Sequence, residues 1–470
     1  MNMFLDSWHL FVLIYFFTIN TFNTALVYLA YLNMRGTMRR SWVVQDKELF
    51  RHAALNSPIS ILVPAYNEEP NVVTNVHSLL SLNYQAFEVI VINDGSKDAT
   101  LQRLIDEFDL YPVERANPNH ISTQAVRQVY LSHYITNLVV VDKENGGKAD
   151  ALNAGLNVSR NPLIAVIDTD SILERNVLLM MARPFMEDPE VVAVGGVVRV
   201  VNGCVIQRGQ VTRVGMPRNW LARMQVLEYL RAFLFGRAGW EALGMLMIIS
   251  GAFGMFRKEA MVAAEGFRHD TVGEDMELVV RIRHRFAASG RKYKVRFMGE
   301  PVCWTEVPET LAQLGSQRDR WQRGLLDSMF SHRTMLLNPR YGRIGMVAMP
   351  YYILFEGLGP LVEVAGLVSV AVSASLGRID LMFGLAFFCA AILLGVVMSL
   401  SALALEELTF HRYPGKGMIL MMVFLGIAEN FGYRQLNSWW RLKGTLNYLR
   451  GSRQWGEMAR RGFSKPGDST

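Results

Sequence analysis

The chain has 470 residues, of which 51% are hydrophobic and 19% charged, against about 25% charged in typical soluble domains, so a disordered or purely soluble chain is disfavoured. Lys and Arg exceed Asp and Glu by 48 − 42 = 6, which does not suggest a nucleic-acid binder and fits an anionic membrane surface or a phosphorylated substrate better. The cysteines Cys204, Cys303 and Cys389 lie far apart without C-x-x-C spacing, which indicates neither a disulfide framework nor a zinc site.

The first predicted element is a membrane-spanning helix. The stretch 8–32 contains no Lys, Arg, Asp or Glu and exceeds the roughly 20 residues that cross a bilayer. Arg35, Arg39 and Arg40 follow at once, and the positive-inside rule places this end in the cytoplasm. We therefore predict an N-terminal transmembrane helix within residues 1–40, with the N-terminus outside.

From residue 58 onward, short β-branched runs alternate with segments of helical periodicity. The predicted strands are 59–63, 89–92 and 163–167, and the predicted helices are 71–82, 147–158 and 177–185. This alternation is typical of a largely parallel α/β sheet, in which ligands bind at the carboxyl ends of the strands. We predict one such domain over residues 58–333.

Residues 218–237 carry apolar side chains at helical spacing beside charged ones. Two interpretations stay open for this segment. It is either a helix in the membrane interface or an ordinary amphipathic helix packed on the domain.

The chain becomes apolar again after Arg343, and we predict C-terminal transmembrane helices within 344–440. Candidate spans lie within 344–376 and 381–405, whereas the run 418–428 is nearer the length of an interfacial or re-entrant segment. The tail, 441–470, is basic and favours a cytoplasmic location. Three crossings satisfy this and four do not, and the number of C-terminal spans stays open.

Acidic residues follow two of the predicted strands. Asp168 and Asp170 come directly after 163–167, where hard oxygen donors suit Mg²⁺ or Mn²⁺ bridging a diphosphate. Asp94 and Gly95 follow 89–92, where the glycine permits a tight turn and the carboxylate can accept hydrogen bonds from a base or ribose. Either motif alone occurs by chance in turns, so their joint presence carries the interpretation.

Two further motifs lie on predicted helices. Glu274 and Asp275 open one helix, a position where acids are also common for helix-dipole reasons. Gln317, Arg320 and Trp321 lie at i, i+3 and i+4, on one face of another helix. An amide, a guanidinium and an indole make a poor core, but they suit a diphosphate and a sugar ring.

In this order the motifs resemble those of the processive family 2 glycosyltransferases, which include the cellulose, chitin, hyaluronan and poly-N-acetylglucosamine synthases. The matching segments are PAYNE at 64–68, NDGS at 93–96, GKADALN at 147–153, DTD at 168–170, GED at 273–275 and Q-x-x-R-W at 317–321. The run 303–310 looks most like the poly-N-acetylglucosamine synthases. The resemblance covers about 58–333 and the arrangement of the membrane helices. It implies an α/β fold in which a GT-A type, Rossmann-like cytosolic domain is inserted between transmembrane helices.

The resemblance also implies a role for each matching residue. Asp275, with Glu274 beside it, matches the catalytic base, and Trp321 matches a contact with the acceptor sugar. Ser250 and Gly251 lie where related synthases place a loop around the acceptor, although a small-residue turn fits this segment equally well. The implied nucleotide-sugar ligands are Tyr66, Glu68, Asp94, Lys148, Asp168, Gln317 and Arg320, and the implied metal ligands are Asp168 and Asp170.

From this resemblance we expect a membrane-embedded, inverting enzyme that polymerises a UDP-sugar, with UDP-N-acetylglucosamine or UDP-glucose favoured, into an extracellular polysaccharide and translocates it. The implied cofactor is Mg²⁺ or Mn²⁺. The implied partners are the UDP-sugar donor, the growing polysaccharide acceptor, the lipid bilayer and regulatory or export subunits, with no nucleic acid. The expected location is the inner (plasma) membrane, multi-pass, with the catalytic domain cytoplasmic. A non-processive transferase that places one sugar on a lipid carrier and a catalytically silent subunit are the alternatives.

Charged residues elsewhere give two more predictions. The basic run 281–285 is expected to form a solvated face. Glu363 and Glu429 lie within apolar stretches, where ionisable groups are expensive and often functional, so either is a candidate for lining a polymer path.

Overall fold

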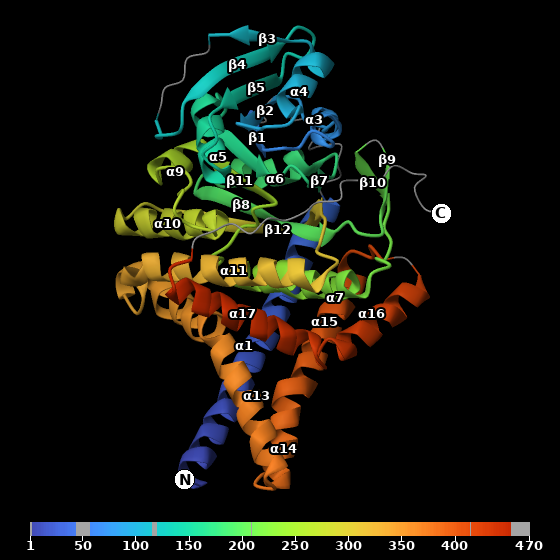
Figure 1. Cartoon of the computed structure of the whole chain (residues 1–470), viewed down its shortest axis with the longest axis vertical. Coiled ribbons are helices and arrows are strands. Elements are labelled where there is room, and N and C mark those ends of the chain that lie inside the picture. The colour runs from blue at the N-terminus through green and yellow to red at the C-terminus, as the bar shows by residue number, and fades with distance from the viewer. Residues whose placement is uncertain (1, 44–56, 115–119, 208, 414, 453–470) are drawn as a thin grey trace. The chain divides into compact units, whose positions relative to one another are not determined.

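The computed structural model describes residues 2–43, 57–114, 120–207, 209–413 and 415–452, and the chain divides into two compact units. We call one the sheet unit, which consists of Arg39–Gly215, Leu246–Glu306 and Glu457–Thr470, the last segment lying outside the described residues. The other, which we call the helical unit, consists of Met1–Met38, Met216–Met245 and Val307–Gly456. Figure 1 labels the helices and strands of both units.

The sheet unit contains a ten-stranded sheet in the order β3-β4-β5-β2-β1-β6-β11-β8-β12-β7 (Figure 1). Its parallel centre is formed by β5 (Leu138–Lys143), β2 (Phe87–Asp94), β1 (Ile59–Ala65) and β6 (Leu163–Ile167). These strands are almost entirely buried, which explains their near-continuous apolar sequence. The helices that alternate with them are α3 (Val72–Leu80), α4 (Thr100–Phe108), α5 (Lys148–Val158) and α6 (Val177–Glu187). The predicted strands and helices are thus confirmed.

Both sides of this centre are antiparallel. On one side, β4 (Val126–Ser132) runs antiparallel to β5 and to β3 (Leu110–Val113). On the other, β11 (Phe253–Arg257) runs antiparallel to β6 and to β8 (Val191–Val200). The prediction of a largely parallel sheet therefore holds for the four central strands and for the β8–β12 pair described below, but not for the antiparallel strands between and beyond them, because antiparallel neighbours need no helical crossover and leave no alternating pattern in the sequence.

The sheet unit is completed by elements at the far side of β8. β12 (Lys294–Thr305) pairs in parallel with β8 and antiparallel with β7 (Ile172–Leu173). The other elements are the hairpin of β9 (Val205–Gln207) and β10 (Gln210–Arg213), and the helices α9 (Lys258–Ala263) and α10 (Glu274–Ala288).

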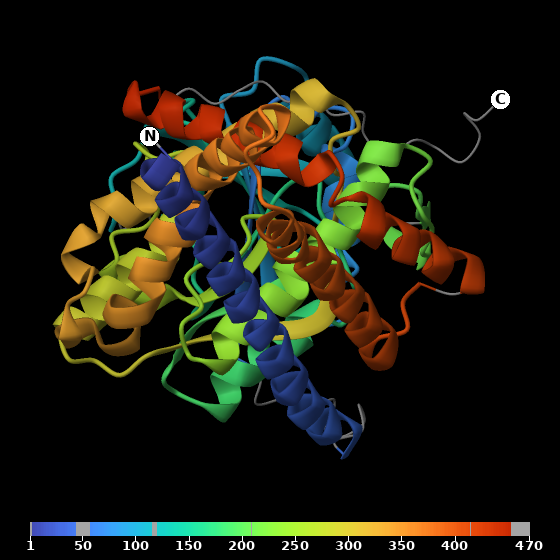
Figure 2. The same ribbon diagram turned by 90° about the horizontal axis from the view of Figure 1, so that it is seen from below.

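The helical unit contains the apolar helices. Among the residues that the structure describes, two helices are long and apolar enough to cross a membrane. One is Ser7–Arg35 within α1 (Asn2–Val43). The other is Met382–Thr409, which runs through α14 (Leu381–Phe388), the π-helical η7 (Cys389–Leu393) and α15 (Leu394–Thr409). The helices α1, α13 (Gly359–Ser375) and α14 pack together around Val12, Phe16 and Phe387 (Figures 1 and 2). The first predicted span and the span predicted within 381–405 are therefore confirmed as helices of sufficient length.

The span predicted within 344–376 is bent. Its two parts, Ile344–Gly357 and Gly359–Ser375, meet at an angle of 42°. They are long and apolar enough to cross a membrane only when they are taken together as one span. The first part is built of η5 (Ile344–Ala348), α12 (Met349–Tyr351) and η6 (Tyr352–Gly357). Pro360 stands in the first turn of α13, where proline fits well, but it cannot continue the hydrogen-bond ladder from the preceding helix.

The rest of the helical unit consists of shorter or more polar helices. These are α7 (Trp220–Tyr229), η2 (Leu230–Gly236), α8 (Arg237–Ala242), α11 (Leu311–Ser331), the short turns η3 (Arg333–Met335) and η4 (Pro339–Tyr341), α16 (Lys416–Ala428) and α17 (Tyr433–Leu449). The predicted domain 58–333 includes 216–245 and 307–333, which here belong to the helical unit, since α7 packs on α16 and η2 on α15. The predicted basic tail begins inside α17, and residues 453–470 lie outside the described part of the chain.

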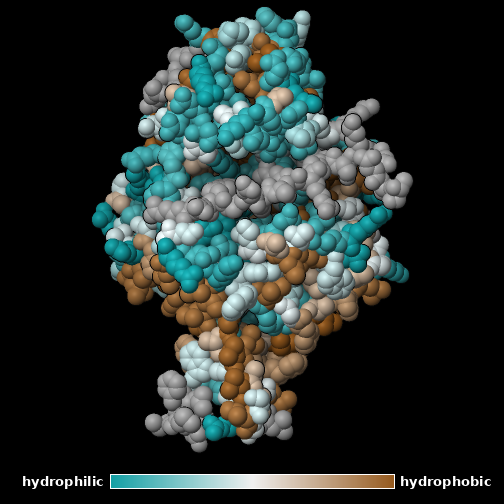
Figure 3. All heavy atoms as spheres, in the orientation of Figure 1, coloured by the Kyte–Doolittle hydropathy of each residue, from teal (hydrophilic) through white to brown (hydrophobic). Residues whose placement is uncertain are grey.

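Exposed apolar side chains gather on the helical unit. Figure 3 shows brown, hydrophobic spheres over α13 and α14, whereas the visible face of the sheet unit is mainly teal. The exposed residues include Phe11, Phe17, Leu361, Val372, Met382 and Phe388 on the three candidate spans. Such a band is expected of helices that face lipid.

Candidate functional site

The candidate site begins at one edge of the sheet unit, where three central strands end. β1 and β2 pair until Ala65 lies opposite Asn93, and β6 pairs with the other side of β1. The residue after Tyr66 is Asn67, whose φ of 54° turns the chain so that its N–H donates to Ser96 Oγ at 3.0 Å. The predicted 64–68 and 93–96 motifs are therefore brought together, with Tyr66 exposed and Glu68 half-buried.

Asp94 is buried, and both of its carboxylate oxygens accept hydrogen bonds. Lys143 Nζ lies 2.6 Å from Oδ1, and the N–H groups of Gly146 and Gly147 donate at 3.0 and 2.8 Å. Asp94 thus fixes the loop that precedes Lys148, and its contact with a base or ribose stays a prediction.

Lys143 is a residue that sequence reasoning missed. It is fully buried at the end of β5, and its Nζ lies 2.6 Å from both Asp94 and Asp150. The available signal was a lysine ending an apolar strand, because a buried cation requires anionic partners. This ion-pair centre joins the end of β2, the end of β5 and the first turn of α5.

Lys148, the first residue of α5, is the cation of the site. Its Nζ lies 2.5 Å from Asp168 Oδ1 and 3.4 Å from Glu274 Oε1. Burial alone would lower the pKa of Lys148, but the Asp168 and Glu274 carboxylates outweigh that effect and raise the pKa above its ordinary value. Lys148 is therefore protonated at neutral pH, and both it and Asp168 keep about a quarter of their side-chain surface exposed, at 22% and 26%.

Asp275 lies next to this cation, in the first turn of α10. Its Oδ2 accepts a hydrogen bond from Gly251 N, and its Oδ1 one from Met276 N, both at 2.8 Å. Burial and the neighbouring Glu274 carboxylate raise the pKa of Asp275 above its ordinary value, against a smaller opposing effect of Lys148. A Cβ atom on Gly251 would lie 3.3 Å from Asp275 Oδ2 and 3.4 Å from Lys148 Nζ, so these three residues meet closely.

The turn after β6 carries the two predicted metal ligands. It is tied down by Thr169, whose hydroxyl donates to Pro64 O at 3.0 Å, and by Asp168 N, which donates to Ala252 O at 3.3 Å. Within the described residues, no group of three or more His, Cys, Asp or Glu side chains is arranged to hold a metal ion. Two carboxylates, Asp168 and Asp170, fit an ion that takes its other ligands from a diphosphate and water, and this site stays a prediction.

Gln317, Arg320 and Trp321 lie on α11 of the helical unit. The Trp321 ring lies 5.8 Å from that of Phe233, and the Arg318 guanidinium lies 4.3 Å over it. Gln317 is buried, and its Oε1 has no hydrogen-bond partner among the residues that the structure describes. These residues belong to a different unit from the sheet-edge residues, and their predicted contacts with donor and acceptor stay predictions.

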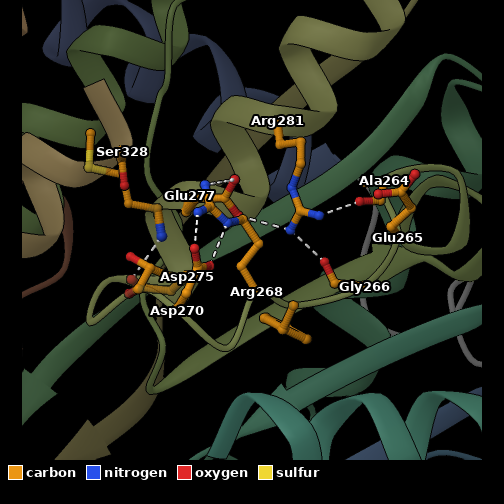
Figure 4. A network of polar contacts seen from close by, with 12 residues as sticks. Ala264, Glu265, Gly266, Arg268, Asp270, Asp275, Glu277, Arg281 and Ser328 are labelled. Carbon is orange, nitrogen blue, oxygen red and sulfur yellow. Dashed lines mark hydrogen bonds and ion pairs between the residues drawn. The ribbon is translucent and has the colours of Figure 1, made fainter. Parts of the chain in front are cut away.

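A buried charge network anchors α10, which carries the predicted catalytic pair (Figure 4). Glu277 is fully buried and lies 2.8 Å from Arg281, which also donates to Gly266 O at 2.6 Å. Arg283, also buried, donates to Leu246 O at 2.8 Å. The prediction of a solvated face for 281–285 is therefore wrong at these two arginines, because they satisfy loop carbonyls that burial has removed from water.

The two glutamates predicted as candidates for lining a polymer path have partners inside the helical unit. Glu429 is fully buried and contacts both Arg231 and Ser399. Glu363 accepts a hydrogen bond from Ser438. We therefore assign Glu429 to an ion pair between η2 and the end of α16 and not to the lining of a path.

Comparisons with known proteins agree with the motif order. A family profile described as "Glycosyltransferase like family 2" matches residues 57–324, more than half of the chain. A poly-beta-1,6-N-acetyl-D-glucosamine synthase of Staphylococcus aureus (strain COL) is 28% identical over 278 residues, 58% of this chain and 57% of the relative. The synthase of the same name from Staphylococcus epidermidis is 29% identical over 267 residues, 57% of this chain and 54% of the relative. The chain thus matches little more than half the length of these relatives.

Solved structures give weaker likenesses. The mannosyltransferase PcManGT from Pyrobaculum calidifontis, in complex with GDP-Man and Mn²⁺, has a TM-score of 0.48 at 17% identity and covers 88% of this chain and 99% of its own. S. aureus TarS 1-349 in complex with UDP-GlcNAc has a TM-score of 0.37 at 12% identity, with 84% and 92% covered. Neither value supports a functional argument.

Proposed function

The chain belongs to the glycosyltransferase-like family 2, and from this premise we propose that it transfers a sugar from a UDP-sugar bound at the edge of the sheet unit. We propose further that it adds sugars repeatedly to a growing polysaccharide that it exports across the plasma membrane. UDP-N-acetylglucosamine is favoured over UDP-glucose, because the curated relatives at 28% and 29% identity are named poly-N-acetylglucosamine synthases. Transfer of a single sugar to a lipid carrier is the alternative.

The observation that carries this proposal is the meeting of Lys148, Asp168, Glu274 and Asp275. Lys148 and Glu274 each begin a helix, and helix N-termini favour anions. The arrangement thus combines a protonated amine and two helix N-termini, which suit a diphosphate, with a carboxylate that suits a proton acceptor.

The charge changes of the reaction fit these residues. Departure of the sugar leaves new negative charge on UDP, which Lys148 and the N-terminus of α5 stabilise. A Mg²⁺ or Mn²⁺ ion held by Asp168 and Asp170 would supply further positive charge to the diphosphate when bound. From the family resemblance, we also assign Tyr66, Glu68 and Asp94 to the uridine side of the donor.

Asp275 is the proposed general base. The backbone N–H groups of Gly251 and Met276 hold its two oxygens, which orients the carboxylate before the acceptor hydroxyl arrives. A carboxylate with a raised pKa is a better proton acceptor near neutral pH than an ordinary one. We infer a single in-line displacement with inversion at the anomeric carbon, and we assign Gln317, Arg320 and Trp321, from the resemblance, to the diphosphate and the acceptor sugar.

The proposed membrane arrangement has three crossings. They are Ser7–Arg35, the bent pair up to Ser375, and Met382–Thr409, with the sheet unit in the cytoplasm. The proposed partners also include regulatory or export subunits.

The test uses the full chain purified in detergent. It is incubated with labelled UDP-N-acetylglucosamine, UDP-glucose and other UDP-sugars in the presence of Mg²⁺ or Mn²⁺, and the products are sized. Asp275→Asn is compared with Glu259→Gln, which removes the same charge from a side chain that is 68% exposed. We expect high-molecular-weight label from one donor with the unchanged chain and with Glu259→Gln, and none with Asp275→Asn.

Two other outcomes would contradict this proposal. Label confined to a lipid-sized product would replace polymerisation by single transfer. Failure to turn over any donor, with the protein folded and metal supplied, would refute the transferase proposal in favour of a silent subunit.

A further inference from the structure

Two consecutive helices of the helical unit, α16 and α17, each expose a continuous stripe of side chains. On α16 the stripe is entirely apolar and consists of Leu420, Phe424, Ile427 and, just past the helix end, Phe431. The spacing of i, i+4 and i+7 places the first three on one helix face, and Phe431 follows in the turn after the helix. The opposite face, with Met422 and Leu425, is buried.

The exposed stripe of α17 has the same spacing but a different chemistry. It consists of Trp439, Lys443, Leu446 and Arg450, which we call the α17 stripe, and Trp439 is 56% exposed. Among the residues that the structure describes, neither Lys443 nor Arg450 has an ion-pair partner. By contrast, Arg441 on another face of α17 lies 2.9 Å from Glu356.

The buried side of α17 fixes its position within the helical unit. Arg441 binds Glu356 directly before the bend, and Ser438 donates to Glu363 within α13, the helix after it. α13 starts at this bend and continues as the apolar part of a candidate span. α17 therefore packs at the end of a spanning segment, where the hydrocarbon of a bilayer gives way to headgroups.

α16 is too short to cross the bilayer itself. It has 13 residues, or about 20 Å, whereas the hydrocarbon core is roughly 30 Å thick. It packs on α15, the last part of another candidate span, and on α7, where Trp220 and Phe424 form a ring contact at 5.9 Å. Figure 2 shows α16 and α17, in red, at the outside of the helical unit.

We propose that α16 and α17 lie in the cytoplasmic interface of the bilayer and that the α17 stripe binds the phosphate headgroups of anionic phospholipids. The apolar stripe of α16 enters the acyl region, while Trp439 and Leu446 anchor α17 at headgroup depth. Lys443 and Arg450 then meet lipid phosphates as their missing counter-charges. This inference rests on the proposed membrane location and does not depend on the proposed transfer reaction.

The charge of the α17 stripe favours a lipid surface over a soluble protein as its binding partner. The apolar stripe of α16 and the exposed apolar faces of the spans together form a surface that water does not favour. A helix whose exposed face mixes an indole, leucine and unpaired cations is typical of a helix lying on an anionic membrane.

The test measures retained lipid directly. The full chain is purified in mild detergent micelles that contain equal amounts of phosphatidylglycerol and phosphatidylcholine, and the bound lipids are counted by native mass spectrometry. The unchanged chain is expected to retain phosphatidylglycerol in preference to phosphatidylcholine. Lys443→Gln with Arg450→Gln should lower phosphatidylglycerol retention at least about fivefold, while Lys443→Arg with Arg450→Lys should keep it.

A matched control removes two cations from the sheet unit. Arg291→Gln with Lys292→Gln changes side chains that are 53% and 85% exposed, and it should leave lipid retention unchanged. Equal retention of both lipids, or an equal loss in the control, would overturn the proposal. Asp275→Asn should retain phosphatidylglycerol like the unchanged chain, so a failure of the transferase proposal and a failure of lipid binding give different results.

Discussion

Two lysines five positions apart have different functions at the scale of single residues. Lys148 is partly exposed and faces the proposed diphosphate, whereas Lys143 is buried and neutralises Asp94 and Asp150. Buried cations of this kind stabilise only while their partners are present, since removing one leaves an uncompensated charge.

We predict that Lys143→Met destabilises the protein strongly. It leaves two buried carboxylates without their cation, and the expected cost is roughly 3–5 kcal/mol. The midpoint of thermal unfolding of the purified full chain measures it. Lys148→Met serves as the control, because its partner Asp168 keeps access to water, and it should abolish transfer with a much smaller shift of the midpoint. Equal midpoints for Lys143→Met and the unchanged chain would contradict this assignment.

The pH dependence of transfer follows from Asp275. A general base must be deprotonated, and burial with the neighbouring Glu274 carboxylate raises the pKa of Asp275. The rate should therefore fall as pH decreases through that raised pKa, at higher pH than an ordinary aspartate would give. The raised pKa of Lys148 keeps it protonated throughout the neutral range. Initial rates at saturating donor between pH 5 and pH 9 test this, and a flat acidic side would exclude Asp275 as the base.

At the scale of elements, the helices and strands that local sequence determines were predictable, whereas the pairing between distant strands was not. Strands β1, β2 and β6 and helix α5 were predictable because apolar runs and helical periodicity are properties of the local sequence. The antiparallel flanks were not, because strand pairing depends on segments far apart in the chain.

The same limit applies to the site. The motifs placed Lys148, Asp168 and Asp275 correctly in one unit, since each follows a strand or begins a helix at the same sheet edge. They gave no indication that Lys143 neutralises Asp94, or that Arg281 binds loop carbonyls, because a charged residue's partner is chosen by tertiary packing.

Helix α10 should depend on its buried arginine. Arg281→Met removes the close partner of Glu277 and the donor to Gly266 O, so we expect a loss of roughly 3 kcal/mol in the free energy of unfolding. Arg285→Met on the same helix should cost less than about 1 kcal/mol, because Arg285 and its partner Glu265 are exposed. Chemical unfolding of both variants provides the comparison, and similar losses would contradict a special role for Arg281.

At the scale of the whole molecule, the proposed three crossings would place the loop 377–380 outside the cell and the sheet unit inside it. The starting variant carries Cys389→Ser, because Cys389 is an exposed thiol that would itself react. In this background, Arg378→Cys should react with a membrane-impermeant maleimide on intact cells. In the same background, Lys292→Cys should react only after the cells have been permeabilised. Labelling of both sites on intact cells, or of neither, would refute the proposed topology.

The order of strands along the chain also determines when each edge of the sheet is covered during synthesis on the ribosome. The four central strands are complete once Ile167 has been synthesised, but β11, which covers the free edge of β6, starts only at Phe253, 253 − 167 = 86 residues later. At about 5–20 residues per second this takes roughly 4–17 s. During that interval β6 presents an open edge of fully apolar strand, which is exposed to edge-to-edge pairing with another chain until β11 has been made and covers it.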